Sequence, residues 1–315
     1  MTITDWSGAA PGAVAELYAR ESQQWRDAFD WDTAAQWLEV ETARTAWGLP
    51  GLLATDDAGQ PVGWLFYLPG PSGAQLGGVS ATTHTMTRAL VAAFANREQG
   101  RTFAAFIPAL SPGLEEALHL VGCETIPHLH LVASLDRLTQ PPMTRPVDAG
   151  ITLRPWRTGD DLVAAQVLLS SYARDDAALF APTGAPDEWL TYVTNLVEQI
   201  GCGRFVPESS VVVERDGRPA GIALVTLVSG AMAHLAQIAV MRDAQGRGLG
   251  GALLDAALGA ARAGGARAMS LLVSSKNKGA IALYRRYGFE PRGHFLEARG
   301  LASSSGPSDQ VTPVG

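Results

Sequence analysis

Cysteine is nearly absent from this sequence, which contains only Cys123 and Cys202. Two cysteines this far apart provide neither a disulfide framework nor the spacing of a metal site, so we expect no metal. Positive charge is also scarce, since the formal net charge is -7 and the pI is about 5.4. A basic surface is what displaces counterions from nucleic acid, so this composition argues against a nucleic-acid partner.

Targeting signals are also lacking. The first residues, MTITDWSGAAPG, have no basic segment followed by an apolar run, so we predict no signal peptide. The apolar stretch 221–241 is long enough to cross a membrane, but Ser229 and Gly230 interrupt it. His234 and Gln237 would also be costly in lipid. Two buried strands joined at Ser-Gly explain this stretch better, and we expect a cytoplasmic protein without a membrane partner.

The chain repeats itself. Its 315 residues suit two domains, and 47% hydrophobic residues indicate a folded protein. Matching segments recur in the same order, separated by roughly 150 to 166 residues. The pairs are TITDW and ITLRPW at 2–6 and 151–156, Tyr18 and Tyr172, Trp37 and Trp189, Gly59 and Gly217, and LVGCE and RYGFE at 120–124 and 286–290. We therefore expect two related domains.

Composition sets the expected boundaries. Prolines and polar residues replace any periodic pattern over 134–149, which predicts a linker. The first domain then covers 1–133 and the second 150–302. The segment 303–315 has too few apolar residues to pack, so we expect a mobile tail.

The second half alternates strands and helices. We expect a strand at 151–156, helices at 160–172 and 187–200, and three strands within 211–240. A glycine-rich loop then opens a helix that ends at Gly264 and Gly265. A strand at 268–274, a helix at about 278–287 and two short strands complete the order β-α-α-β-β-β-α-β-α-β-β.

The glycine-rich loop carries the strongest chemical signal. It runs from Gln245 to Gly251 as QGRGLGG, after a strand and before a helix. Such a loop presents backbone N–H groups to an anion, aided by the helix dipole. The spacing also fits the dinucleotide fingerprint G-x-G-x-x-G, but the next strand, SLLVSSKN, lacks the acidic residue which that site needs. A plain structural turn is the remaining alternative.

Two motifs together resemble the GNAT superfamily of N-acetyltransferases. Residues 245–250 are similar to its pyrophosphate loop, Q/R-x-x-G-x-G/A. Downstream, the segment from Asn277 to Phe289 is similar to its second signature, N-x-x-A-x-x-x-Y-x-x-x-G-F. The resemblance covers 150–300, and it reaches 1–133 only through the repeat. It implies an α/β (α+β) fold of two GNAT-like domains, each a mixed, mostly antiparallel twisted sheet flanked by helices.

The resemblance also implies site residues. It assigns acetyl-CoA as the acyl donor, with the pantetheine arm on the strand before the loop, the pyrophosphate on the loop and an amine that attacks the thioester directly. Tyr284 matches the tyrosine that protonates the leaving thiolate; core packing is its alternative. Asn277 is expected to cap a helix and to reach the cofactor arm. The cofactor-binding residues are Ile238, Ala239, Val240, Gln245, Gly246, Arg247, Gly248, Leu249, Gly250, Gly251 and Asn277.

The general base is less clear. Leu272 stands where the ribosomal-protein branch has a glutamate, which weakens that kind of substrate. His234 stands where the histone-acetylating branch has one, and an imidazole titrating near pH 6.5 suits the task. Simple alternation places His234 on one strand face with Ile238 and Val240. A half-buried structural histidine is the alternative, and Glu214 and a water chain are further candidates for the base.

The loop between the first two helices of this half is expected to shape the acceptor site. Its acids, Asp175, Asp176, Asp187 and Glu188, would attract a cationic amine, although helix capping is the commoner role of such residues.

The first half lacks both the glycine-rich loop and the tyrosine. Its counterpart of the loop, 79–91, contains no glycine, and Leu118 replaces the tyrosine, so we expect it to be degenerate. Six of the eight tryptophans lie here, for core packing or as the lining of a ring-shaped substrate.

The expected function is acetyl-CoA-dependent acetylation of a small-molecule amine by a monomer or homodimer. Alternatives are a mycothiol-synthase-like tandem acetyltransferase, a protein lysine or N-terminal acetyltransferase, and a non-catalytic acyl-CoA-binding module.

Overall fold

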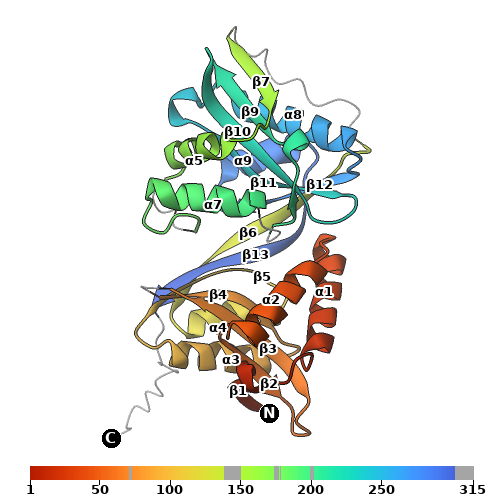
Figure 1. The fold of residues 1–315 in the computed structure, drawn as a ribbon, viewed down its shortest axis with the longest axis vertical. Helices are drawn as coiled ribbons and strands as arrows, with labels where there is room; N and C mark the ends of the chain where they lie inside the picture. Colours follow the sequence, from red (N-terminus) through yellow and green to blue (C-terminus); the bar gives the residue numbers. More distant parts are fainter. Residues whose placement is uncertain (71–72, 138–149, 174–176, 178, 199–201, 302–315) are drawn as a thin grey trace, which may run out of the picture. The chain divides into compact units, whose positions relative to one another are not determined.

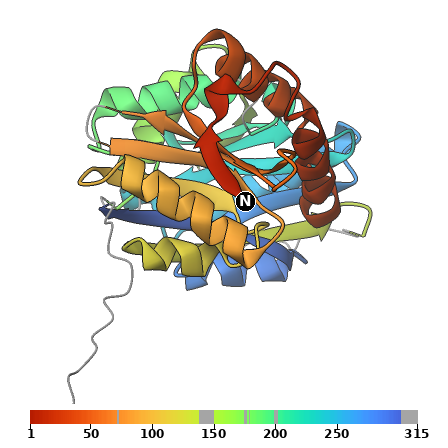
Figure 2. The same ribbon diagram turned by 90° about the horizontal axis from the view of Figure 1, so that it is seen from below.

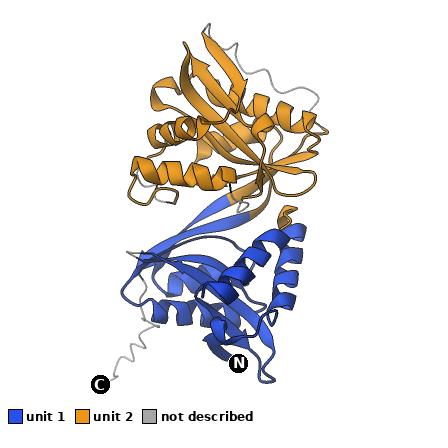
Figure 3. Cartoon of the chain, in the orientation of Figure 1, with its two compact units in different colours: residues 1–27, 33–128, 294–315 blue, residues 28–32, 129–293 orange. Residues whose placement is uncertain are grey.

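The computed structural model describes residues 1–70, 73–137, 150–173, 177, 179–198 and 202–301. The chain forms two compact units (Figure 3). Unit 1 contains Met1–Asp27, Thr33–His128 and the described residues from His294 onwards. Unit 2 contains Ala28–Asp32 and the described residues of Leu129–Gly293. The expected tail and most of the expected linker lie outside the described residues, and the domain limits 1–133 and 150–302 stay a prediction.

The first half of the chain builds a sheet flanked by helices (Figure 1). Its elements are β1 (Thr2–Asp5), α1 (Ala15–Phe29), α2 (Ala34–Ala46), β2 (Gly51–Thr55), β3 (Pro61–Pro69), β4 (Gly73–Ser80), α3 (His84–Arg97), β5 (Thr102–Pro108), α4 (Leu114–Leu120) and β6 (Cys123–Ser134).

The second half repeats this order. Its elements are β7 (Ile151–Pro155), α5 (Asp160–Ser171), α7 (Pro186–Glu198), β8 (Arg204–Phe205), β9 (Val211–Arg215), β10 (Arg218–Leu227), β11 (Met232–Val240), α8 (Leu249–Ala263), β12 (Ala268–Ser274), α9 (Lys278–Arg286) and β13 (Glu290–Leu301). The structure differs from expectation at two points: β8 is an additional short strand, and β13 is one strand where we expected two. The apolar stretch 221–241 forms β10 and β11, as predicted.

Strand pairing is the same in both halves. The orders β1-β2-β3-β4-β5 and β7-β9-β10-β11-β12 are antiparallel until the last pair, which is parallel. The fourth strand of each order, β4 in the first and β11 in the second, also carries a β-bulge. Phe66 pairs with Gly78 and Tyr67 with Leu76, which leaves Gly77 as the extra residue. Leu224 pairs with Gln237 and Val225 with Leu235, which leaves Ala236 as its counterpart. The repeat seen in the sequence is therefore a repeat of architecture.

The last strand of each half contributes to the other half's unit. In unit 1, β13 pairs antiparallel with β5, with Leu296 opposite Ile107. In unit 2, the end of β6 neighbours β12, and the Leu135 N–H donates to the Arg267 carbonyl at 2.8 Å. Each unit is consequently completed by a segment that is distant in sequence.

Helices bury apolar residues against both faces of the sheet in each unit (Figures 1 and 2). In unit 2, α8 and α9 pack on one face and α5 and α7 on the other. In unit 1, α3 and α4 share one cluster, and α1 and α2 contribute to a second that contains Trp6, Trp37 and Trp64. No helix in the described part of the chain is long and apolar enough to span a membrane.

The start of β2 offers a test of this packing. A Cβ on Gly51 would overlap the Trp6 ring, which is fully buried and stacked on Phe66. We expect Gly51→Ala to lower the free energy of unfolding by about 1–3 kcal/mol, because a packed aromatic cluster cannot absorb the added methyl group. Gly8→Ala is the control, since its Cβ meets nothing within 4 Å. Urea unfolding measures both; equal stabilities would contradict the packing described.

Candidate active site

The centre of unit 2 is the place where β11 and β12 separate. These parallel strands pair only from Met232 to Leu235 with Ala268 to Leu271. Beyond that point β11 continues to Val240 and is paired with β10 alone. The bulge at Ala236 follows directly after the last paired residue, and bulges bend the strand that carries them. Before the loop, the backbone edge of β11 that faces β12 is therefore not paired with that strand.

The glycine-rich loop continues from this edge into α8. Gly246 and Gly248 have φ of 76° and 82°, a left-handed conformation that side chains disfavour. Within the described chain, the N–H groups from Gly246 to Gly251 donate no hydrogen bond, and Gly248 caps α8 without a side-chain partner. Gln245 differs, because its N–H contacts the Arg242 carbonyl at 3.4 Å and its side chain donates to the Val240 carbonyl at 3.0 Å. These amides and the positive end of the α8 dipole suit a pyrophosphate.

The corresponding place in unit 1 is filled by the chain's own side chains. The Ser111 hydroxyl accepts from the Ala81 N–H at 3.1 Å and donates to the Val79 carbonyl at 2.9 Å. Thr83 caps α3 by accepting from the Met86 N–H at 3.2 Å. Leu118, which replaces the tyrosine, is fully buried in the core. Side chains thus pair with backbone groups here, whereas the loop N–H groups of unit 2 donate no hydrogen bond in the described chain.

Helix α9 carries the second signature. The Asn277 side chain accepts from the Ala280 N–H at 3.0 Å, which confirms its expected role as a cap. Tyr284 lies in the core of unit 2 beside Phe289, with 6% of its surface exposed. Its hydroxyl has no hydrogen-bond partner in the described chain, and burial raises its pKa, so it keeps its proton at neutral pH. Tyr287 differs, because its hydroxyl donates to the Gly251 carbonyl at 3.3 Å.

His234 lies on β11 opposite Thr226 of β10 and Ser270 of β12. Its Nδ1 is 2.9 Å from the Ser270 hydroxyl. Burial and the neighbouring His130 lower the pKa of His234 to about 3, so the imidazole is neutral at physiological pH and only weakly basic. Its role as the base stays a prediction.

The prediction that His234 shares a strand face with Ile238 and Val240 was wrong. Because Ala236 is an extra residue in the bulge, alternation is interrupted between Leu235 and Gln237. Ile238 lies opposite Ala223, on the side of α8, whereas His234 lies opposite Thr226, on the face that carries Leu224.

Two of the remaining acids, Glu214 and Glu188, have structural partners. Arg154 donates to Glu214 at 2.7 Å and pairs with Asp160 at 2.7 Å. The Glu188 carboxylate accepts from the N–H groups of Thr183, Gly184 and Ala185, which makes it a cap at the start of α7. Asp175 and Asp176 lie outside the described residues. No group of three or more metal-ligating side chains is found among the described residues.

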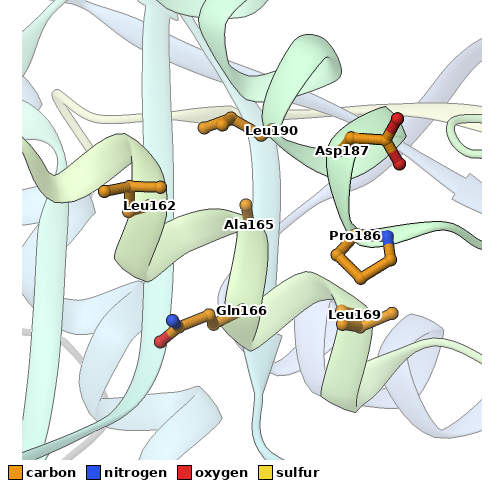
Figure 4. A pocket seen from close by; sticks show the side chains of 7 residues that line it. All are labelled: Leu162, Ala165, Gln166, Leu169, Pro186, Asp187 and Leu190. Carbon is orange, nitrogen blue, oxygen red and sulfur yellow. The ribbon is translucent and has the colours of Figure 1, made fainter.

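A shallow pocket of about 200 Å³ lies between α5 and α7 (Figure 4). It is lined mostly by apolar side chains and by Asp187. None of the residues predicted from the two motifs lines it. The lining residues are Leu162, Ala165, Gln166, Leu169, Pro186, Asp187 and Leu190.

Sequence reasoning missed the neighbours of His234. Trp31 lies edge-on to it with ring centroids 5.0 Å apart, and the fully buried His130 contacts both Trp31 and Phe29. No local pattern points to these residues, because they are scattered along the chain.

Comparison with known proteins agrees with this geometry. Residues 173–289 match the profile described as "Acetyltransferase (GNAT) family". The mycothiol acetyltransferase of Clavibacter sepedonicus is 35% identical over 138 residues, which are 42% of this chain and 45% of that protein. The chain spans less than half the length of the curated relatives it matches.

Solved structures share the fold over most of the chain. A GCN5-related N-acetyltransferase from Sphaerobacter thermophilus has a TM-score of 0.67 at 19% identity, covering 96% of this chain and 98% of that one. A tandem GNAT protein from the clavulanic acid biosynthesis pathway has a TM-score of 0.57 at 21% identity, covering 82% and 84%. With the two motifs and the separated strands in place, residues 173–289 match the GNAT acetyltransferase family, and most of the chain shares the fold of these solved structures.

Proposed function

We propose that this protein transfers an acetyl group from acetyl-CoA to a primary amine of a small molecule. The observation that carries the proposal is the row of unpaired N–H groups from Gly246 to Gly251, at the N-terminus of α8 and beside the separated strands. Acetyl-CoA supplies an activated acyl group as its thioester. The loop amides would hold its pyrophosphate, and the backbone of Ile238 to Val240 would hold its pantetheine arm.

Two side chains are proposed to move protons. Attack by the amine nitrogen on the thioester carbonyl forms a C–N bond, and the C–S bond then breaks. His234 accepts the proton that the nitrogen loses, and Tyr284 donates a proton to the leaving sulfur. The protonated Tyr284 hydroxyl and its lack of a partner in the described chain support this assignment.

The similarity to the mycothiol acetyltransferase of Clavibacter sepedonicus favours a second candidate function, which is mycothiol acetyltransferase activity. Both candidates transfer an acetyl group, and the acceptor distinguishes them. The cytoplasmic location and the monomeric or homodimeric state stay predictions.

The proposal is tested first by binding and turnover. We expect acetyl-CoA to raise the melting temperature, because it binds the loop only when the protein is folded. NADH should leave the melting temperature unchanged, because the acidic residue of a dinucleotide site is missing. Thiol release is then followed with amino sugars, thiol-bearing amines, polyamines and lysine peptides. Stabilisation by NADH alone would refute the loop assignment. Release with lysine peptides alone would refute the small-molecule acceptor.

Gly248 tests the loop itself. We expect Gly248→Val to raise the Kd for acetyl-CoA by about 10- to 100-fold, because each lost amide bond to a charged group is worth about 1.5–3 kcal/mol. The matched control is Gly265→Val at the other end of α8, where φ is 93° and the Cβ also meets nothing within 4 Å. Calorimetric titration compares them. Equal Kd values in the two variants would assign the effect to backbone strain.

Tyr284 tests the chemistry. We expect Tyr284→Phe to lower kcat by about 100-fold or more while the Kd for acetyl-CoA is unchanged, since only the proton donor is removed. In the control Tyr287→Phe, the bond to the Gly251 carbonyl is lost, so stability falls and kcat changes little. Undiminished turnover in Tyr284→Phe would remove Tyr284 as the acid.

A further inference from the structure

The surroundings of His234 contain a segment from the first half of the chain. Ala28–Asp32 belongs to unit 2, although Met1–Asp27 and the residues from Thr33 onwards belong to unit 1. Its end is fixed by the Asp32 N–H, which donates to the Val228 carbonyl just after β10 at 3.0 Å. Asp30 has φ of 55°, a left-handed conformation that turns the chain directly after α1 ends at Phe29.

This segment places two aromatic rings on two imidazoles. The Trp31 ring is 5.0 Å from the His234 ring at an interplanar angle of 82°. The Phe29 ring is 5.0 Å from the His130 ring at 74°. Both are edge-to-face contacts, which fix the relative orientation of the rings. Trp31 and His234 are both buried, with 7% and 4% of their surfaces exposed.

The Ser270 hydroxyl bonds Nδ1 of His234, and the nitrogen that is basic depends on the direction of this bond. The Ser270 hydroxyl lies 3.4 Å from the Ala233 carbonyl and 2.9 Å from His234 Nδ1. When this hydroxyl donates to the carbonyl, it accepts from Nδ1–H, and the lone pair of the ring then lies on Nε2. Nε2 has no hydrogen-bond partner in the described chain. In this tautomer Nε2 is the atom available to an acceptor amine.

We propose that Trp31 is a positioning residue of the active site, which holds the His234 ring against Ser270 and shields it from water so that Nε2 faces the acceptor. The inference rests on the proposed function, because it assigns the base to His234. It gives the first half of the chain a part in catalysis, although that half binds no acyl donor in the scheme above.

The surroundings of His234 keep its imidazole neutral. The titratable group facing His234 is His130 from β6, whose own pKa is lowered to about 4 by burial and by Arg292 of β13. β12 contributes the uncharged Ser270 and β10 the uncharged Thr226. With Trp31 removed, water reaches the imidazole, and the pKa of His234 rises from about 3 towards its ordinary value of about 6.5. The imidazole is then partly protonated, and so inactive as a base, below about pH 6.5.

The experiment compares Trp31→Ala and Trp31→Phe with Trp47→Ala, a control at the end of α2 whose side chain is 79% exposed. The readouts are kcat for thiol release with the best amine of the panel, the stabilisation by acetyl-CoA, and NMR titration of the His234 ring protons between pH 5 and 8. We expect Trp31→Ala to lower kcat by about 10- to 100-fold with stabilisation by acetyl-CoA retained. Its His234 signal should titrate near pH 6, whereas the wild-type signal should not titrate in this range.

The phenylalanine variant separates positioning from folding. Trp31→Phe keeps an aromatic ring over His234, so kcat and the flat titration should be largely restored. Should the alanine variant fail to fold, Trp31→Leu takes its place, since it keeps apolar volume without the ring. Wild-type kcat and an unchanged His234 titration in Trp31→Ala, or in Trp31→Leu where it replaces the alanine variant, would overturn the inference. Failure of the proposed function is distinguishable, because wild-type protein would then release no thiol with any amine while the titration still reports on Trp31.

Discussion

The site depends on the end of one strand pairing. The parallel strands β11 and β12 stop pairing after Leu235 and Leu271. Beyond these residues their facing backbone groups are not bonded to each other and could contact a ligand. Pairing stops there because the bulge at Ala236 bends β11 just before its chain turns into the glycine loop. The loop amides, the dipole of α8 and the backbone of Ile238 to Val240 are brought to one place by this divergence.

The first half shows that separation of two parallel strands does not by itself leave backbone groups unpaired. Its bulge at Gly77 and its parallel pair β4 and β5 repeat the same backbone plan. There, however, Ser111 bonds the Ala81 N–H and the Val79 carbonyl, and Thr83 caps α3. A polar group that already has a good partner gains little from a ligand. Unit 2 keeps its amides unpaired because glycine provides no side chain to satisfy them.

The same architecture explains why the two halves are joined. Each last strand completes the other half's unit, and the segment Ala28–Asp32 leaves unit 1 to cover His130 and His234. The half without the glycine loop thus supplies structural parts of the other unit. Its buried tryptophans serve mainly as core, as in the cluster of Trp6, Trp37 and Trp64, and Trp31 is the one that contacts a candidate site residue.

The sequence by itself determined the repeat, the order of elements in the second half apart from β8 and the single strand β13, the glycine loop and the cap at Asn277. These are local properties: a positive φ needs glycine, a helix start needs a cap, and buried strands need apolar runs. Only the tertiary structure decided the face of His234, because one bulged residue reverses the alternation and leaves no mark in the sequence. It alone brought Trp31, His130 and Ser270 to that histidine, since contacts between residues far apart in the chain depend on register and packing, which no local pattern encodes.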